Sequence, residues 1–147
     1  MRIGKVLVVC VGNICRSPMA EAMLQHELKD KPDISVTSAG LGAPVGEPAS
    51  EYAVVLMEER GIDISSHRAQ QLTAELVRKA DLILVMESRH KKAIESGDPA
   101  ARGKVFRLGE WLNREIADPF RQPRQAFEEA LADIDDCVAD WVEKLKA

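Results

Sequence analysis

A short segment near the start of the chain combines residue types that could bind and attack a phosphate ester. It reads Cys10-Val-Gly-Asn-Ile-Cys-Arg-Ser-Pro18. A cysteine thiolate is a strong nucleophile, and the planar guanidinium of Arg16 can grip two oxygens of one phosphate. A lone cysteine after an apolar run is more often a core residue. With Gly12, Arg16 and Pro18 at these spacings, the pattern instead predicts an anion-binding loop with Cys10 as nucleophile.

The residues on either side predict a strand before this segment and a helix after it. Val6–Val9 is typical of a strand buried on both faces of a sheet. Apolar residues recur at helical spacing from Pro18, which itself suits a first helical turn. The backbone N–H groups between the two elements can then surround an anion at the positive end of the helix. Gly12 is expected to allow a backbone conformation that a Cβ would hinder, whereas Ser17 either bonds the thiolate or caps the helix.

The rest of the chain alternates short apolar runs with amphipathic stretches, which predicts an α/β fold with a parallel sheet and helices on both faces. The further strands are expected at Ile34–Ser38, Leu82–Met86 and Lys104–Leu108. Helices are expected from Ala49 to Arg60, ending at a left-handed Gly61, and after the third strand as far as Ser96. The last helix has an apolar stripe that runs from Phe127 to Leu145, and a loop rich in Gly and Pro spans Gly40–Pro48.

Ligands of parallel sheets bind outside the carboxyl ends of the strands. This rule places the segment 10–17, Ser38, the segment 87–89 and Asp118 at one functional edge. Expulsion of a poor leaving group is helped by a proton donor, and an aspartate before proline has a backbone biased toward extended geometry. Of the two Asp-Pro pairs, Asp98 falls on the opposite edge. Asp118 is therefore the candidate acid, with an ordinary loop-turn aspartate as the alternative.

Length and composition set the outer limits. The chain has 147 residues, a net charge of −4 and 46% hydrophobic residues, which favours one compact domain over residues 1–147 and excludes a broadly basic nucleic-acid binder. The longest strongly apolar run, Val6–Val11, is shorter than a membrane span or a signal-peptide core. An odd count of three cysteines fits a reducing compartment. We expect a cytoplasmic protein, a monomer or weak dimer, that uses no cofactor and no metal.

The nonapeptide in its strand-to-helix context resembles the phosphate loop of the low-molecular-weight protein-tyrosine phosphatases. The resemblance continues over nearly the whole chain, through Ala20-Glu-Ala22, Ser38-Ala-Gly40, Gly61-Ile62, Ser66-His67, Asp81–Met86 and Asp118-Pro119. It implies a three-layer fold with a four-stranded parallel sheet and the phosphate loop after its first strand. It also implies hydrolysis of phosphotyrosine through a phosphocysteine on Cys10, with Arg16 holding the phosphate and Asp118 as general acid.

Further roles follow from the resemblance alone. The phosphate-binding residues would be those of the loop: Val11, Gly12, Asn13, Ile14, Cys15, Arg16 and Ser17. Asn13, Ser38 and His67 match positions that brace the loop, although alone Asn13 would indicate a turn and His67 a surface or capping histidine. Val11, Leu41 and Phe120 would wall the substrate ring.

Two positions carry additional expectations. The family commonly has two tyrosines or Tyr-Arg after Asp-Pro, whereas this chain has Phe120-Arg121, so regulation by phosphorylation is not expected there. Cys15 would bond to an oxidised Cys10 and protect it, unless it is merely a packed thiol. Elsewhere we expect His26 and His90 to face water, Glu58–Arg60 to be solvated, Cys137 to be structural, and the Met and Trp residues to be core or helix-packing groups.

Other functions on the same fold stay open as alternatives. A thiol-dependent arsenate reductase needs relay cysteines near the third strand, and residues 82–92 contain none. In protein-arginine phosphatases the residue before the second loop cysteine resembles threonine, but here it is Ile14. A non-catalytic phosphate-binding or redox-sensing module would not need Cys10, Arg16 and Asp118 together. The chain resembles the bacterial members of the family in two segments, Ser38–Ala43 and Asp118–Arg121. The resemblance implies that the partner is a phosphotyrosine protein. A candidate is an autophosphorylating tyrosine kinase that governs capsule or exopolysaccharide export.

Overall fold

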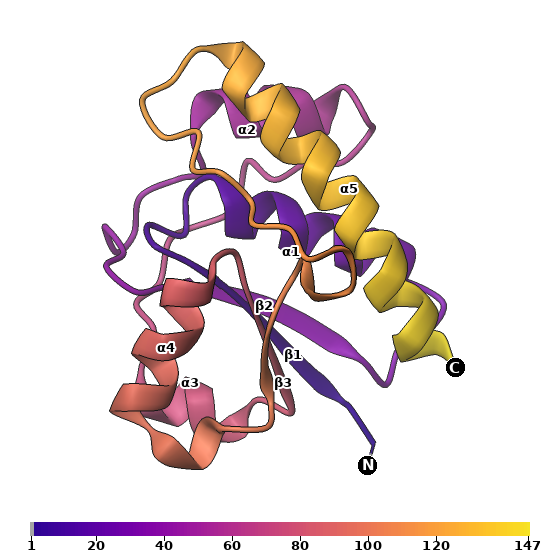
Figure 1. The fold of residues 1–147 in the computed structure, drawn as a ribbon. Coiled ribbons are helices and arrows are strands. Elements are labelled where there is room, and N and C mark those ends of the chain that lie inside the picture. Colours follow the sequence, from indigo (N-terminus) through magenta and orange to yellow (C-terminus); the bar gives the residue numbers. More distant parts are fainter. Residues whose placement is uncertain (1) are drawn as a thin grey trace.

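The computed structural model describes residues 2–147 and is built on a four-stranded parallel sheet (Figure 1). The strands follow the order β2-β1-β3-β4, and all three pairings are parallel. Their bounds are Lys5–Cys10 for β1, Ser35–Gly40 for β2, Leu82–Val85 for β3 and Val105–Arg107 for β4. The predicted α/β fold class is confirmed, and the nucleophile candidate ends the central strand β1.

Helices cover both faces of the sheet (Figure 1). On one face lie α1 (Arg16–Glu27), α2 (Glu51–Glu58) and α5 (Arg124–Lys146), and on the other lie α3 (Ala74–Lys79) and α4 (Ser88–Gly97). Along β1, Val6 and Val8 pack into the first layer, whereas Leu7 and Val9 pack into the second. A strand buried on both sides has no use for alternating polar residues, which explains its unbroken apolar sequence.

The observed elements lie close to the predicted ones, with one omission. Gly61 has a φ of 77° just beyond α2, so the predicted left-handed residue is confirmed. Helix α3 was not predicted, since six residues are too few to display helical periodicity. Its available signal was Thr73, whose hydroxyl caps the helix by accepting from the backbone N–H of Leu76. Two 3₁₀ turns, Pro99–Ala101 and Glu110–Leu112, flank β4.

One side chain, that of His90, differs from the sequence expectation. His90 does not face water: it is only 2% exposed, because the first turn of α4 packs it inward beside the end of β3. Trp111 is a helix-packing residue: it is 49% exposed, its ring is tilted by 59° to that of the buried Trp141 in α5, and Nζ of Lys144 lies 4.3 Å from its centroid. The buried Cys137 and the exposed His26 are placed as predicted.

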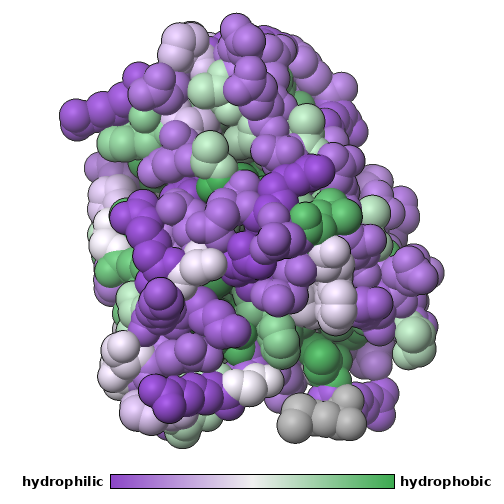
Figure 2. Space-filling view, in the orientation of Figure 1, coloured by the Kyte–Doolittle hydropathy of each residue, from purple (hydrophilic) through white to green (hydrophobic). Residues whose placement is uncertain are grey.

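The face of the molecule drawn in Figure 2 is mostly hydrophilic, with apolar side chains in small separate areas. Within residues 2–147, no helix combines the length and the apolar content that crossing a membrane requires.

Candidate active site

The loop between β1 and α1 takes its shape from Asn13. Asn13 has a φ of 57°, in the left-handed region that asparagine tolerates better than most residues. The prediction that Gly12 supplies a special conformation is wrong, since a Cβ at this position would meet Ile14 at an ordinary contact distance of 3.5 Å. Asn13 therefore makes the turn that brings the chain from β1 into the helix.

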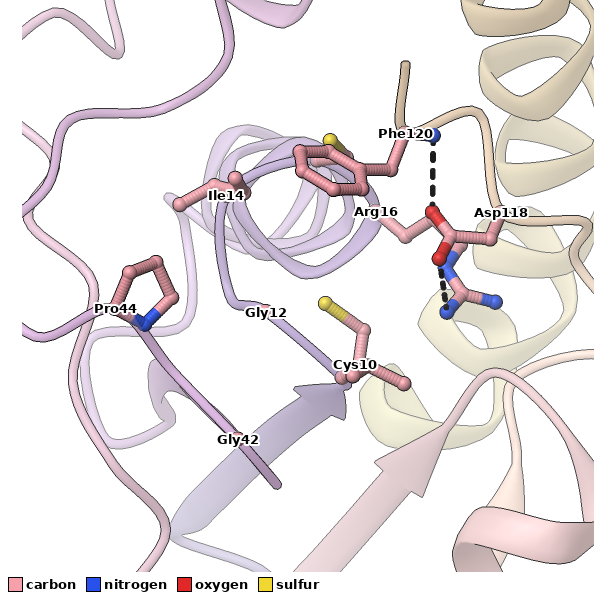
Figure 3. A pocket seen from close by; sticks show the side chains of 10 residues that line it. Cys10, Gly12, Ile14, Arg16, Gly42, Pro44, Asp118 and Phe120 are labelled. Atoms are coloured by element: carbon pink, nitrogen blue, oxygen red, sulfur yellow. Dashed lines mark hydrogen bonds and ion pairs between the residues drawn. The ribbon is translucent and has the colours of Figure 1, made fainter. Parts of the chain in front are cut away.

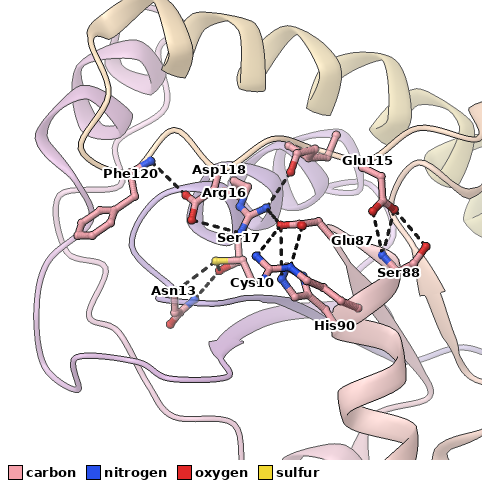
Figure 4. Close-up of polar contacts among 12 residues, drawn as sticks. Cys10, Asn13, Arg16, Ser17, Glu87, Ser88, His90, Glu115, Asp118 and Phe120 are labelled. Carbon is pink, nitrogen blue, oxygen red and sulfur yellow. Dashed lines mark hydrogen bonds and ion pairs between the residues drawn. The ribbon is translucent and has the colours of Figure 1, made fainter.

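The thiol of Cys10 lies buried at the end of β1, under this loop. Its Sγ accepts a hydrogen bond from the backbone N–H of Asn13 at 3.3 Å and lies 3.0 Å from Oγ of Ser17 (Figure 4). Helix α1 has no side-chain cap. Of the two readings left open for Ser17, the structure therefore selects the contact with Cys10.

The side chain of Arg16 is only 1% exposed and is fixed along one edge of its guanidinium. Its Nη1 donates to Oε2 of Glu87 and to the carbonyl oxygen of Ile116, both at 2.7 Å. Its Nε and Nη2 are buried and have no hydrogen-bond partner among residues 2–147. An unpaired buried donor costs about 1–3 kcal/mol, so this pair of free donors marks a place for an anion that can bind both.

Glu87 follows β3 and connects this arginine to a second one. Its Oε1 accepts from Nε of Arg89 at 2.9 Å. Burial alone would raise the pKa of Glu87, but the hydrogen bonds from Arg89 and Arg16 and the charge of Arg16 outweigh burial and lower the pKa from 4.5 to about 2. Sequence reasoning placed Glu87 on the functional edge but gave it no role, since a carboxylate after a strand has many uses.

Asn13 links the loop to the neighbouring strand β2. Its Nδ2 donates to Oγ of Ser17 at 2.8 Å and to Oγ of Ser38 at 2.9 Å, and its Oδ1 accepts from the backbone N–H of Gln70 at 2.9 Å. Nε2 of His67 donates to the Asn13 carbonyl at 2.7 Å. The structure thus brings together the three residues expected to brace the loop.

The same network contains two residues that the sequence did not single out. Glu21 accepts a hydrogen bond from Oγ of Ser38, and Nε2 of Gln70 donates to the carbonyl oxygen of Ser38 at 2.8 Å. Glu21 belongs to a quoted motif, Ala20-Glu-Ala22, so a signal existed for it. Gln70 had none, because a glutamine in a connecting segment is unremarkable.

Asp118 reaches the pocket from the segment between β4 and α5. Its Oδ2 lies 3.6 Å from Nη2 of Arg16, and its Oδ1 accepts from the backbone N–H of Phe120 at 3.1 Å (Figure 3). The segment is held to the end of β3 by a hydrogen bond from Ile116 N to the carbonyl oxygen of Met86, at 3.1 Å. In contrast, Asp98 caps the 3₁₀ turn that precedes β4, with its Oδ1 bonded to Ala100 N.

These groups surround a cavity of about 180 Å³ that opens beside Phe120, which is 48% exposed. Its lining residues are Cys10, Val11, Gly12, Ile14, Cys15, Arg16, Gly42, Pro44, Asp118 and Phe120 (Figure 3). The expectation that Leu41 walls the cavity is wrong. Leu41 packs instead against the core cluster under α3 and α4, and Gly42 and Pro44 of the same loop line the cavity.

Comparison with known proteins identifies the family in which Cys10, Arg16 and Asp118 surround one cavity. A family profile described as "Low molecular weight phosphotyrosine protein phosphatase" matches residues 5–147. The chain belongs to this family. The resemblance drawn from the sequence is thereby confirmed.

Individual relatives agree with the family. The probable low molecular weight protein-tyrosine-phosphatase EpsP of Ralstonia nicotianae is 55% identical, over 99% of this chain and 98% of that protein. The solved structure of Vibrio vulnificus Wzb in complex with benzylphosphonate has a TM-score of 0.91 at 43% identity, over 97% of this chain and 99% of the other. The YwlE arginine phosphatase from Geobacillus stearothermophilus has a TM-score of 0.90 at 37% identity, over 97% and 92%.

Cys15 is the second thiol of the pocket and differs chemically from the first. Burial, together with the nearby Cys10 and Asp118, raises its pKa to about 12. Cys15 is therefore a protonated thiol at neutral pH. The third cysteine, Cys137, lies in the core, and burial raises its pKa to about 11. Within residues 2–147, no three or more His, Cys, Asp or Glu side chains are grouped closely enough to hold a metal ion.

Proposed function

We propose that this protein is a protein-tyrosine phosphatase that hydrolyses phosphotyrosine in proteins through a phosphocysteine on Cys10. The observation that carries the proposal is the pair of buried, unpaired donors on Arg16, which line the same cavity as the Cys10 thiol. Two parallel N–H donors match two oxygens of a phosphate. An anion bound to them would present its phosphorus to the sulfur below.

The arrangement assigns each group a step. Cys10 attacks phosphorus, while the Arg16 fork and the backbone N–H groups of residues 11–17 hold the phosphate oxygens as negative charge develops on them. Asp118, at the rim of the cavity, gives a proton to the phenolic oxygen as the bond to phosphorus breaks. Asp118 then takes a proton from the water that hydrolyses the phosphocysteine. Apart from the hydrolytic water, residues of this chain supply the nucleophile, the phosphate-binding donors and the proton donor for these two steps.

The cavity walls support an aromatic substrate. Ile14, Pro44 and Phe120 are apolar, and a half-exposed aromatic ring at the mouth can stack on the phenyl ring of phosphotyrosine. Arginine phosphatase is the second candidate, since one solved relative carries that name. The apolar Ile14 beside Cys15 favours tyrosine over arginine, because a guanidinium would leave its N–H groups unpaired against this wall.

For the biological setting we propose a reducing compartment such as the cytoplasm, because the reaction needs Cys10 as a free thiol. The substrate that fits best is an autophosphorylated tyrosine kinase, opposed by this enzyme in the control of capsule or exopolysaccharide export. Support for this role comes from the bacterial character of Ser38–Ala43 and Asp118–Arg121 and from relatives such as EpsP.

A kinetic panel tests the proposal. Purified protein in the presence of a metal chelator is offered matched peptides bearing phosphotyrosine, phosphoserine or phosphoarginine, with arsenate reduction as a fourth reaction. We expect efficient release of phosphate from phosphotyrosine only, and loss of turnover to background in Cys10→Ser. Cys137→Ala is the matched control, a buried cysteine outside the cavity, and should keep full activity. Preference for phosphoarginine, or unchanged activity in Cys10→Ser, would refute the proposal.

A further inference from the structure

His90 is a buried histidine that the proposed reaction does not use. It lies in the first turn of α4, and neither Nδ1 nor Nε2 of its ring has a hydrogen-bond partner among residues 2–147. Nearly all buried polar groups in native proteins are paired. An apolar side chain of similar size would fill the same space without an unpaired nitrogen. Packing alone therefore does not account for a histidine here.

The ring lies next to the group that holds Arg16. Nε2 of His90 is 3.5 Å from Oε2 of Glu87, the same oxygen that accepts the 2.7 Å hydrogen bond from Nη1 of Arg16 (Figure 4). The backbone N–H of His90 also donates to the carbonyl oxygen of Glu87, at 3.0 Å. His90 thus contacts Glu87, which holds Arg16, the residue whose Nε and Nη2 are the proposed phosphate-binding donors.

The surroundings favour a neutral ring. Burial lowers the pKa of His90; among the charged groups that face it, Glu87 and Glu115 raise the pKa, whereas Arg16 and Arg89 lower it. A neutral imidazole carries a single N–H. With that proton on Nε2, the N–H bond lies near Oε2 of Glu87 as a polar contact at 3.5 Å, without forming a hydrogen bond.

Glu87 is shared between two arginines, which gives its contact with His90 a purpose. Arg89 donates to both of its oxygens, from Nε to Oε1 at 2.9 Å and from Nη2 to Oε2 at 3.4 Å. Arg89 is exposed on the outer side, whereas Arg16 is buried on the inner side. A carboxylate free to turn toward Arg89 would release Nη1 of Arg16, and the guanidinium would lose its fixed orientation.

We infer that His90 is a positioning residue for Arg16. Its neutral imidazole holds the Glu87 carboxylate in the orientation that grips Nη1, so that Nε and Nη2 remain turned toward the cavity. The inference rests on the proposed function in taking phosphate as the ligand of those two donors. Nothing in it requires His90 to touch the substrate.

Calorimetric binding of inorganic phosphate to three single variants tests the inference without turnover. His90→Met keeps a similar volume and removes the donor, His90→Gln keeps an amide donor near the position of Nε2, and His26→Met is an exposed control on another helix. We expect His90→Met to bind phosphate about 3- to 10-fold more weakly, because Glu87 loses the polar N–H that lies 3.5 Å from its Oε2. His90→Gln and His26→Met should bind within about twofold of wild type.

Two further measurements separate positioning from a structural role. The melting temperature of His90→Met should stay close to that of wild type, because methionine fills a similar volume at this buried position. In a Glu87→Gln background, His90→Met should weaken phosphate binding no further, since both changes act through the contact between His90 and Glu87.

The outcomes are distinct. Wild-type affinity in His90→Met would overturn the inference, and so would a loss that His90→Gln does not restore or a full additional loss in the Glu87→Gln background. If the wild-type protein binds phosphate but leaves phosphotyrosine peptides intact, the proposed function fails, and the comparison of the His90 variants still decides the positioning role.

Discussion

Two cysteines share the pocket but have different neighbours. Cys10 accepts the N–H of Asn13 and lies beside the Ser17 hydroxyl, whereas burial raises the pKa of Cys15 to about 12. A protonated Cys15 leaves the attack on phosphorus to Cys10. It also leaves a reduced thiol available in the same cavity if Cys10 is oxidised.

Treatment with peroxide is expected to form a disulfide between Cys10 and Cys15. Peroxide oxidises the Cys10 thiolate to a sulfenic acid. The Cys15 thiol then attacks the sulfur of this acid, which forms the disulfide and releases water. Because the Cys15 pKa is about 12, the second step should accelerate as pH rises toward that value, since the thiolate is the attacking form. Peptide mass spectrometry and recovery of activity with a thiol reductant are the measurements. In Cys15→Ser, Cys10 should go on to sulfonic acid. Irreversible oxidation of Cys10 with Cys15 present would contradict the protective role.

Asp118→Asn tests the proton donor. We expect the rate with phosphotyrosine, whose phenol is a poor leaving group, to fall about 100-fold or more. An activated aryl ester such as p-nitrophenyl phosphate, whose leaving group needs little protonation, should be affected far less. The slope of rate against leaving-group basicity is the measurement, and Asp98→Asn, the other Asp-Pro pair, is the control. Equal losses across the series would remove Asp118 from this role.

Sequence alone located the three residues to which we assign the chemistry but not the residues that contact and orient them. Cys10 and Arg16 were found because a nucleophile and a guanidinium stand at a characteristic spacing within one loop. Asp118 was found because a proline follows it and it lies at the carboxyl-end edge of the sheet. Glu87 and His90 have no such local pattern. Their importance comes from contacts with Arg16 and Glu87, respectively, and these contacts exist only once the sheet brings the end of β3 beside the loop after β1.

Strand β2 and the phosphate loop approach each other closely at Gly40. A Cβ there would lie 2.7 Å from the carbonyl oxygen of Val11, closer than atoms can pack. The end of β2 therefore sets the position of the loop, in addition to the Asn13–Ser38 hydrogen bond. Sequence reasoning noted Gly40 only as part of a motif, because steric crowding between two segments is not visible in a linear pattern.

Gly40→Ala is expected to displace the loop. The added methyl group should destabilise the fold by about 1–3 kcal/mol, the usual effect of overpacking, and reduce kcat/KM through the misplaced donors. Urea denaturation and steady-state kinetics measure the two effects. Gly97→Ala is the matched control, since a Cβ at Gly97 meets no atom within 4 Å and the residue ends α4 on the other side of the sheet. Full activity in Gly40→Ala would contradict this prediction, because it would show that the loop accommodates the methyl group without moving its donors.

The secondary structure was predicted well where burial alone decides it. The apolar runs at Val6–Val9 and Leu82–Met86 indicated the two central strands, because a strand covered on both faces tolerates few other residues. The short α3 and the cavity wall at Gly42 and Pro44 were missed, since both depend on how a connecting segment folds back onto the sheet.

The molecule as a whole contains a buried cation that only a few groups neutralise. Arg16 has Glu87 at 2.7 Å and Asp118 at 3.6 Å as its ion-pair partners. Removing one partner of a buried pair leaves an uncompensated charge, which is more damaging than the pair is stabilising. The site therefore makes global stability depend on Glu87.

Glu87→Gln is expected to lower the free energy of unfolding at neutral pH by roughly 3 kcal/mol. Because the Glu87 pKa falls from 4.5 to about 2 on folding, its ionised form stabilises the native state above pH 4.5, and this contribution is lost as pH decreases toward 2. The stability difference between wild type and variant should therefore shrink over that interval. Urea titrations at several pH values give the measurement, and Glu58→Gln, on an exposed position of α2, is the control. A difference that stays constant with pH would contradict this assignment.

The hydrogen bond from Arg16 to the carbonyl oxygen of Ile116 joins residues that lie a hundred positions apart in the chain. Contacts of this kind form late when a protein refolds, because distant segments must meet before they can stabilise each other. During recovery from denaturant, helical circular dichroism should therefore return before phosphatase turnover does. The time at which activity returns would then report when the segment around Ile116 docks against Arg16. Simultaneous recovery of both signals would show that the helices and this contact form in one concerted step.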